Sequence, residues 1–477
     1  MSIKDNLVPR IGLEVHVQLG TETKLFSRDS YSFGAEPNEC ISAVTIAHPG
    51  SLPVPNRKAV EFAVKLGLAL DCTISNVLQF DRKNYFYPDL PKGYQITQDA
   101  NPICQGGSVM VGDAKIDLFK IHLEEDAGKS IHNESGNSFV DLNRAGVPLL
   151  EIVTQPDITS SKQAAAFMTE IRKLVRYLEI SDGNMEEGSL RCDANISLHV
   201  PGEPLGSKVE IKNMNSFRHV ARAIDLEIER QSELIAHGES IISETRTYLP
   251  DRKETLRMRT KEELNDYRYF PEPDILPTRL EREWIETVKR DLPDLPWRVK
   301  ERLINEHTIK NEDATIISED RFKAEYYFKA AKRTKDRQSL ANWMVGPLRS
   351  LINEERLSFK KLKLQPETLA ELVNLVDEKK ISHSAAQKIL PVLFKDDEVN
   401  PLEIAKKLNL LQERNVSELK PVIEEILEEF PEKVKEYHKG KKGLIGMFMG
   451  QIMKKTKGSA DPKLTNKLLI ELLNNRK

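Results

Sequence analysis

The segment IGLEVHVQLG, residues 11–20, decides the fold class of the first half of this chain. Its side chains alternate between an apolar set, Leu13, Val15, Val17 and Leu19, and a polar set, Glu14, His16 and Gln18. Because successive side chains of a β-strand point to opposite faces, the alternation predicts a strand that buries one face. The polar face either meets solvent in an antiparallel sheet or carries a functional site.

Three further segments show the same alternation: KIDLFKIHLEED (115–126), LRCDANISL (190–198) and KVEIKNMN (208–215). Their polar positions, with those of the first strand, carry Glu14, His16, Glu124, Arg191, Asp193, Asn195, Glu210 and Lys212. Glu125 follows where the second strand runs into the turn DAGKS. If one sheet aligns these strands, several carboxylates and two cations come together.

Crowded carboxylates raise one another's pKa, and a hard divalent cation relieves that repulsion. Mg²⁺ prefers a few carboxylates together with water and substrate phosphate, and Arg191 and Lys212 are suited to bind phosphate oxygens. Such a constellation suits phosphoryl transfer, although the pattern alone favours a solvated sheet face. The turn DAGKS lacks the first glycine of a phosphate-binding loop. Lys129 and the turn's amides suit an anion, although a plain hairpin turn is the favoured interpretation.

The chain has 477 residues and changes character near residue 280, from mixed strands and helices to an almost wholly helical pattern. We expect an α+β class, with a mainly antiparallel, cradle-like domain over residues 1–285. A helical domain over 286–398 and a small helical tail over 399–477 should follow. In the first domain, Phe167, Ile171, Val175 and Leu178 form one apolar helical stripe, and Phe217, Val220, Ile224 and Ile228 form another.

The charge is unevenly spread. The net charge is −3, yet residues 433–477 carry 12 Lys and Arg against 3 Asp and Glu. A basic end on an acidic body suggests a polyanionic partner, and a solvated helix surface is the alternative. Four separate cysteines without a C-x-x-C pair fit a reducing cytoplasm. No apolar run is long enough for a membrane span.

Longer motifs carry a resemblance to a known family. They are IGLEVHVQL, YFYPDLPKGYQITQ, LEEDAGKS, DLNRAGVPLLEIVTQPD, MEEGSLRCDANIS, EIKNMNSFRHVARAI and MRTKEELNDYRYFPEPDI. In this order, over most of residues 11–275, they resemble the B subunits of the aspartyl/glutamyl-tRNA(Asn/Gln) amidotransferases. The stretch GKKGLIGMFMGQIMKKTKGSADPKLTNKLL resembles the tail domain of the same family.

The resemblance implies an ATP- and Mg²⁺-dependent carbon–nitrogen ligase with glutamine as amide donor. It phosphorylates the side-chain carboxylate of Glu-tRNA(Gln) or Asp-tRNA(Asn), and ammonia then displaces phosphate. The implied partners are the amidase or A subunit, the small C subunit and the misacylated tRNA. The family's metal and catalytic positions match Glu14, His16, Glu124, Glu125 and Asp193. For Arg191, Asn195, Glu210, Lys212 and Lys129 we expect roles in substrate or phosphate binding.

One departure from the family concerns zinc. Many members carry a C-x-x-C before PG.LP, but this chain reads ECISAVTIAHPGSLP with Cys40 alone, so structural zinc is not expected. Two other functions remain open: a non-catalytic tRNA-binding subunit, and a stand-alone ligase that uses free ammonia. The sequence does not determine which misacylated tRNA is the substrate.

Overall fold

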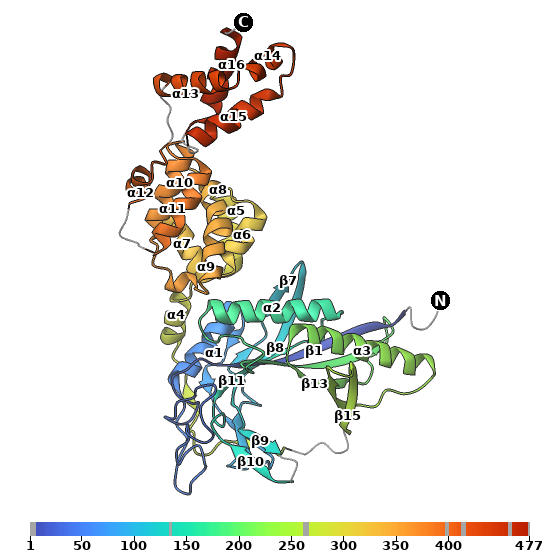
Figure 1. Cartoon of the computed structure of the whole chain (residues 1–477). Helices are drawn as coiled ribbons and strands as arrows, with labels where there is room; N and C mark the ends of the chain where they lie inside the picture. The colour runs from blue at the N-terminus through green and yellow to red at the C-terminus, as the bar shows by residue number, and fades with distance from the viewer. Residues whose placement is uncertain are drawn as a thin grey trace. The chain divides into compact units, whose positions relative to one another are not determined.

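The computed structural model describes residues 6–132, 136–260, 267–395, 400–411, 416–456 and 460–475. The chain divides into two compact units, Met1–Leu295 and Pro296–Lys477, and each is described by itself (Figure 1). The first unit contains the strands, and the second is built from helices. The α+β class predicted from the sequence is confirmed.

The first unit is built on a ten-stranded sheet in the order β15-β14-β13-β12-β1-β11-β8-β6-β2, and β7 pairs with β8. Neighbours are antiparallel except for β13 and β14. The strands are β1 (Val8–Gln18), β2 (Thr73–Ile74), β6 (Cys104–Gln105), β7 (Ser108–Val111), β8 (Ala114–Glu125), β11 (Pro148–Thr154), β12 (Leu190–His199), β13 (Val209–Met214), β14 (Glu244–Leu249) and β15 (Glu254–Thr260). The alternating segment at the start of the chain is therefore a central strand.

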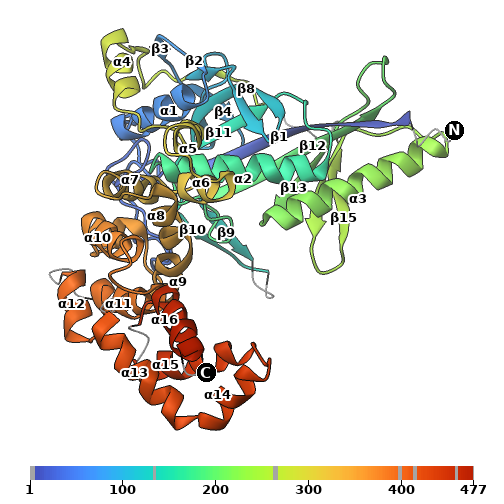
Figure 2. The same cartoon turned by 90° about the horizontal axis from the view of Figure 1, so that it is seen from above.

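Helices cover one face of this sheet. They are α1 (Arg57–Ala69), α2 (Ser161–Tyr177) and α3 (Phe217–Ala236), and they contact β8, β1 and β12 respectively. Figure 2 shows α2 and α3 running along the sheet. Both begin at a serine cap, Ser160 and Ser216, whose hydroxyls accept backbone N–H groups of the first turn. The two predicted apolar stripes face the core of this unit. The opposite face of the sheet is left for polar side chains.

Smaller elements complete the first unit. Three short sheets have the orders β16-β4-β5, β17-β3 and β10-β9. Their strands are β3 (Val77–Leu78), β4 (Asp81–Asn84), β5 (Tyr94–Thr97), β9 (Lys129–His132), β10 (Ser138–Asp141), β16 (Phe270–Pro271) and β17 (Thr278–Arg279). Helix α4 (Arg282–Arg290) packs on α1 and adds Val288 to the first core. The domain division at residues 285 and 398 stays a prediction.

The second unit is helical. Its elements are α5 (Pro296–Asn305), α6 (Asn311–Ser318), α7 (Arg321–Ala331), α8 (Arg337–Trp343), the π-helix η3 (Met344–Leu348), α9 (Arg349–Glu354), the 3-10 helix η4 (Phe359–Lys361), α10 (Pro366–Asp377), α11 (His383–Lys395), α12 (Pro401–Lys407), α13 (Val416–Glu429), α14 (Pro431–His438), α15 (Leu444–Lys455) and α16 (Pro462–Asn475). They form two hydrophobic clusters, one over α5–α12 and one over α13–α16. In the part of the chain that is described, no helix has the length and apolarity to cross a membrane.

Residues 19–56 of the first unit contain neither helix nor strand and are held by side-chain hydrogen bonds. Asp29 is the centre of one set: its Oδ2 accepts from Ser27 and Ser42 at 2.9 Å each, and from the hydroxyl of Thr45. Burial alone raises the pKa of Asp29, but these three hydroxyls lower it overall. Cys40 contributes its backbone oxygen, which accepts from Lys24 Nζ at 2.7 Å. The expectation that this segment binds no zinc stays a prediction.

Replacing Asp29 by alanine should lower the free energy of unfolding by about 1–2 kcal/mol, because three hydroxyls lose an ionised acceptor in a partly exposed site. Asp29→Asn, which keeps one acceptor oxygen, should lose less. Chemical denaturation measures both. Arg28→Ala in the same loop, where the side chain is exposed, is the control. Equal stability of Asp29→Ala and wild type would mean that the loop does not depend on this set of hydrogen bonds.

Candidate active site

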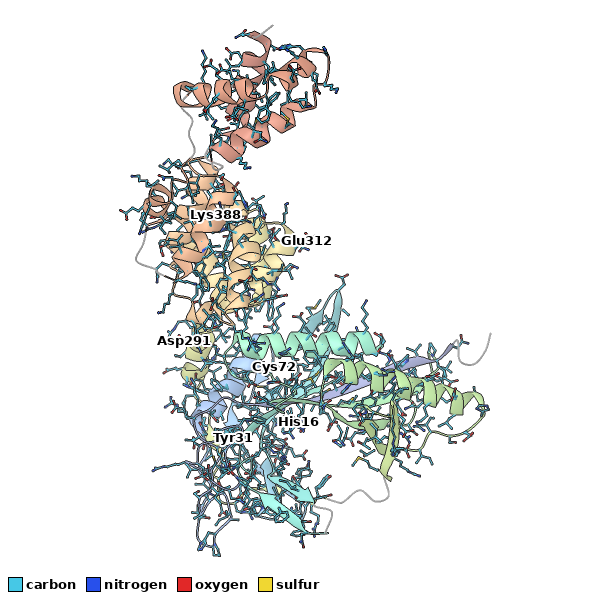
Figure 3. The ribbon with its side chains drawn as sticks, viewed as in Figure 1. His16, Tyr31, Cys72, Asp291, Glu312 and Lys388 are labelled. Atoms are coloured by element: carbon cyan, nitrogen blue, oxygen red, sulfur yellow. The ribbon has the colours of Figure 1, made fainter. Side chains whose placement is uncertain are left out.

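The polar face of the central strands brings distant residues into one row. In the strand register, His16 of β1 lies opposite Arg191 of β12 on one side and Glu151 of β11 on the other. Glu151 in turn lies opposite His122 of β8. The side chain of His16 lies on the side of the sheet away from α2 and α3 (Figure 3). The row therefore lies on the face opposite these two helices, where four neighbouring strands fix its side chains and His122 and Glu124 are buried.

Two imidazoles and two carboxylates meet at this row. His16 Nε2 lies 3.4 Å from Glu151 Oε2 and 3.6 Å from Glu124 Oε1. His122 Nε2 lies 3.3 Å from Glu151 Oε2 and 3.6 Å from Glu124 Oε2. One ligand atom each from His16, Glu124 and Glu151 falls within 4.8 Å of the others. We call these three residues, with His122, the histidine–glutamate group.

The electrostatics of this group stabilise its charged forms. Burial lowers the pKa of His122, but the charge of Glu151 and hydrogen bonding to Glu124 raise it to about 9. The pKa of His16 is raised in the same way, against the effect of burial, by its hydrogen bond with Glu151. Burial would raise the pKa of Glu151, but His122 and His16 hold it well below its usual range. His122 Nδ1 is buried without a hydrogen-bond partner among the described residues.

A second acidic group lies beside the first. Glu14, Asp193 and Glu210 place one carboxylate oxygen each within 4.8 Å of the others, and we call them the three-carboxylate group. Lys212 Nζ lies 2.5 Å from Asp193 Oδ2 and 2.9 Å from Glu210 Oε1. Asn195 Nδ2 donates to Glu14 Oε1 at 2.9 Å. Burial, followed by the charges of Glu151 and Glu210, raises the pKa of Glu14.

The donor atoms of the two groups fit divalent cations differently. The three-carboxylate group offers only oxygens, which suits Mg²⁺ with water and phosphate completing its shell. The ammonium of Lys212 already bridges two of those carboxylates, so the group attracts positive charge. The histidine–glutamate group mixes an imidazole nitrogen with carboxylates, a set that a divalent cation also accepts.

Arg191 stands at the end of the row. One of its terminal nitrogens, Nη2, donates to Asp126 Oδ2 at 2.8 Å, and its Nε is buried without a partner among the described residues. Lys83, on β4, lies with its Nζ 4.8 Å from the ring centre of Tyr267. Burial lowers the pKa of Lys83, but the charge of Glu124 raises it overall. Positive charge is therefore held close to the histidine–glutamate group.

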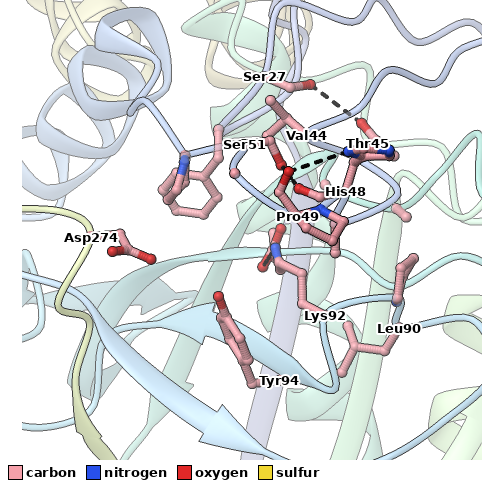
Figure 4. Close-up of a pocket in the computed structure, with 18 of the residues that line it drawn as sticks. Ser27, Val44, Thr45, His48, Pro49, Ser51, Leu90, Lys92, Tyr94 and Asp274 are labelled. Carbon is pink, nitrogen blue, oxygen red and sulfur yellow. Dashed lines mark hydrogen bonds and ion pairs between the residues drawn. The ribbon is translucent and has the colours of Figure 1, made fainter.

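Two predicted site residues lie apart from both groups. Glu125 accepts from the backbone N–H of Ile96 at 2.9 Å and pairs with Lys92. It lines a cavity of about 270 Å³ between β5 and the loop of residues 27–53. Figure 4 shows Lys92 and Tyr94 at this cavity, with Thr45, His48 and Ser51 from the loop. Lys129 is exposed on β9, opposite Asp141 of β10.

Two residues of the site were not predicted from the sequence. Glu151 is a single acid inside the apolar run VPLLEIVT, and that exception in a buried strand was the available signal. The alternation of KIDLFKIHLEED puts His122 on the same polar face as Glu124, but no role was predicted for it. The other predicted residues divide between the groups: His16 and Glu124 in one, Glu14, Asp193 and Glu210 in the other. Lys212, Asn195 and Arg191 contact or flank them.

Comparison with known proteins identifies the family. The family model described as the GatB/GatE catalytic domain matches residues 9–286, and the one described as the GatB domain matches residues 325–473. The B subunit of the aspartyl/glutamyl-tRNA(Asn/Gln) amidotransferase of Thermodesulfovibrio yellowstonii is 46% identical over 468 residues, covering 97% of this chain and 98% of that protein. The protein of the same name from Persephonella marina is 45% identical over 471 residues, covering 98% and 99%.

The chain belongs to the family of aspartyl/glutamyl-tRNA(Asn/Gln) amidotransferase B subunits. This confirms the resemblance stated from the motifs. Both acidic groups lie inside the range that matches the GatB/GatE catalytic domain. The basic end of the chain lies largely inside the range that matches the GatB domain. In this member of the family, the catalytic domain therefore carries the acids and the other matched domain carries the basic tail.

Proposed function

We propose that this chain is the kinase and transamidase subunit of a tRNA-dependent amidotransferase. A carboxylate oxygen of the tRNA-bound glutamate or aspartate attacks the γ-phosphorus of ATP, and ADP leaves. The nitrogen of ammonia then attacks the acyl carbon, phosphate leaves with the bond electrons, and a base takes the surplus proton. The reaction class is a carbon–nitrogen ligase with glutamine as the amide donor.

The observation that carries this proposal is the pair of neighbouring groups on one rigid sheet face. Phosphoryl transfer depends mainly on positioning and charge neutralisation, which side chains fixed by strand register supply. Lys212 and Arg191 are placed to hold phosphate oxygens, and Asn195 orients Glu14.

Glu14, Asp193 and Glu210 would hold Mg²⁺, and His16, Glu124 and Glu151 offer a second cation position. When bound, the metal supplies charge neutralisation and orientation for the triphosphate. An acyl phosphate hydrolyses readily, so a preorganised site favours amide formation over loss to water. Glu125 and Lys129 lie outside both groups; a direct role for Glu125 rests on the family resemblance, and one for Lys129 rests on the anion-binding chemistry expected of the turn DAGKS.

The ammonia comes from a separate amidase subunit, in our proposal, as the family resemblance implies, and three of the four thiols of this chain are buried. Burial raises the pKa of Cys72 to about 12 and holds the pKa values of Cys104 and Cys192 well above their usual range. Buried thiols of this kind are poor nucleophiles. The proposed assembly is this chain with the amidase or A subunit, the small C subunit, and misacylated tRNA as the substrate in the cytoplasm.

The purified chain alone should therefore release no glutamate from glutamine, because we assign the nucleophile for that step to the amidase subunit. Adding both partner subunits should restore glutamine hydrolysis. ADP should then form only when misacylated tRNA is present, and testing Glu-tRNA(Gln) and Asp-tRNA(Asn) separately reveals which tRNA is used. Glutamine hydrolysis by the rigorously pure chain would overturn the division of labour. A complex that binds these tRNAs but never cleaves ATP would support the non-catalytic alternative.

A further inference from the structure

Four side chains of the loop over residues 19–56 converge on one point, and we call them the Asp29 set. They are Ser27, Asp29, Ser42 and Thr45. Asp29 Oδ2 accepts from Ser27 Oγ and Ser42 Oγ at 2.9 Å each, and also from the hydroxyl of Thr45. Ser27 Oγ and Thr45 Oγ1 lie 3.4 Å apart, as the dashed line in Figure 4 marks. Three hydroxyl oxygens therefore surround a single carboxylate oxygen.

The spacing of the Asp29 set along the chain is that of a metal site. Its members form two close pairs, S-x-D at residues 27–29 and S-x-x-T at residues 42–45. Structural metal sites with four ligands are commonly built from two such pairs of closely spaced ligands. The second pair also lies in the stretch before PGSLP (49–53), where many members of the family carry a C-x-x-C pair. The backbone of this loop therefore gathers four side chains as a metal would.

The atoms of the Asp29 set do not fit a metal ion. Structural zinc takes its four ligands mainly from cysteine thiolates and histidine nitrogens, whereas this set offers three neutral hydroxyls and one carboxylate. Hard cations such as Ca²⁺ and Mg²⁺ need further oxygens and water around the carboxylate. Here the three hydroxyls direct their protons at Asp29 Oδ2, so the carboxylate oxygen itself stands at the centre of the set.

The positive charge that a metal would bring is supplied by Lys24. Its side chain is 1% exposed, and its Nζ donates to the backbone oxygens of Cys40 at 2.7 Å and Leu142 at 3.3 Å. Burial lowers the pKa of Lys24 to about 8, so the ammonium stays charged at neutral pH. Burial raises the pKa of Asp29, but the three hydroxyls, followed by the charge of Lys24, lower it overall. One carboxylate and one ammonium therefore balance inside the loop.

The loop held in this way forms one wall of the cavity of about 270 Å³ described above. Thr45 belongs both to the Asp29 set and to that wall, and His48 and Ser51 continue the wall (Figure 4). Lys92 and Glu125 line the same cavity. Because the loop has no helix or strand, it has no continuous ladder of backbone hydrogen bonds and depends on side-chain contacts for its shape.

We propose that the Asp29 set occupies the four ligand positions of a metal site and replaces the metal by a carboxylate oxygen and three hydroxyl protons. The loop is then held without any bound metal, with Asp29 at the centre and Lys24 as the compensating charge. The inference does not rest on the proposed function, because it concerns the anchoring of the loop and no step of the reaction.

Replacing all four residues by cysteine tests this geometry in the full-length chain. The quadruple variant is Ser27→Cys, Asp29→Cys, Ser42→Cys, Thr45→Cys. A cysteine at position 29 is one atom shorter than aspartate, which frees the centre for an ion among four thiolates. Under reducing conditions the variant should bind one Co²⁺ per chain, with the visible absorption of a tetrahedral cobalt thiolate. Zinc should raise its melting temperature, because the ion binds the folded form.

The matched control keeps four new cysteines but carries Ser51→Cys in place of Ser42→Cys. The hydroxyl of Ser51 donates to the backbone oxygens of Ala43 and His48 and lies outside the Asp29 set. The control should bind Co²⁺ at least about 10-fold more weakly, since even the loss of a partner outside the ligand shell costs about 10- to 100-fold in metal affinity. A folded quadruple variant that binds Co²⁺ no better than this control would show that the four positions do not converge, and would overturn the inference.

Wild type gives a second measurement, which does not depend on the folding of that variant. The purified chain should contain no stoichiometric zinc by elemental analysis. Its melting temperature should not change after treatment with a zinc chelator while Mg²⁺ is kept in excess. One zinc per wild-type chain that is lost in Asp29→Ala would contradict the inference, and so would a melting temperature that falls with the chelator and recovers with zinc.

Discussion

Replacing His16 or Glu124 by alanine should lower tRNA-dependent ADP formation by at least about 100-fold, since one lost electrostatic contact to a transition state costs about 3–4 kcal/mol. His16 Nε2 and Glu124 Oε1 lie 3.6 Å apart in the histidine–glutamate group, although their strands come from distant parts of the sequence. Both lie on the polar face of the sheet, so the apolar core keeps its packing. The fold and the binding of tRNA should therefore survive.

The measurement is ADP release by the reconstituted complex, with circular dichroism as the check on folding. Glu124→Gln keeps the shape of the side chain and removes its charge, so it should be nearly as inactive as Glu124→Ala. Lys115→Ala, an exposed position on the same strand, is the control and should leave the rate unchanged. Glutamine hydrolysis by the amidase subunit should continue at least in part. Near-normal ADP formation in both alanine variants would mean that the histidine–glutamate group only stabilises the sheet.

Removing three lysines of the tail that form no ion pair should weaken tRNA binding roughly tenfold or more. It should also reduce the slope of log affinity against log salt concentration by about 3, one for each phosphate contact. The structure indicates which lysines to choose. Lys433, Lys435, Lys441 and Lys455 already pair with glutamates of the same region. Lys439, Lys442 and Lys454 form no ion pair with any described residue. The charge available to a polyanion is therefore smaller than the composition of residues 433–477 suggests.

The triple variant Lys439→Ala, Lys442→Ala, Lys454→Ala should be compared with the double variant Lys433→Ala, Lys435→Ala, whose cations are partly neutralised. Filter binding of tRNA at several salt concentrations gives both affinity and slope. The double variant should change the affinity and the slope less for each lysine removed. Unchanged affinity and slope in the triple variant would mean that the tail is a solvated helical surface. ATP cleavage at saturating tRNA should persist, because the acids lie in the other unit.

Local patterns determined much of this protein. Alternation in IGLEVHVQLG predicted β1 with its polar face, and the apolar spacing predicted α2 and α3, because a strand and a helix each repeat with a fixed period. The same alternation placed Glu14 and His16 on one face. Ordered motifs over most of residues 11–275 indicated the family, which the comparisons confirm. These are properties of short segments, and no knowledge of long-range pairing is needed to see them.

The tertiary structure alone decided which strands are neighbours and in what register. That register brought Glu151, which the sequence had not indicated as a site residue, between His16 and His122. It also divided the predicted acids into two groups. The separation of Glu125 from Glu124, in contrast, follows from β8 alone, because adjacent residues of a strand face opposite sides and β8 continues through Glu125. Both partners of β1 lie more than a hundred residues away in the chain, and only long-range hydrogen bonding and core packing select among the many pairings that each alternating segment allows.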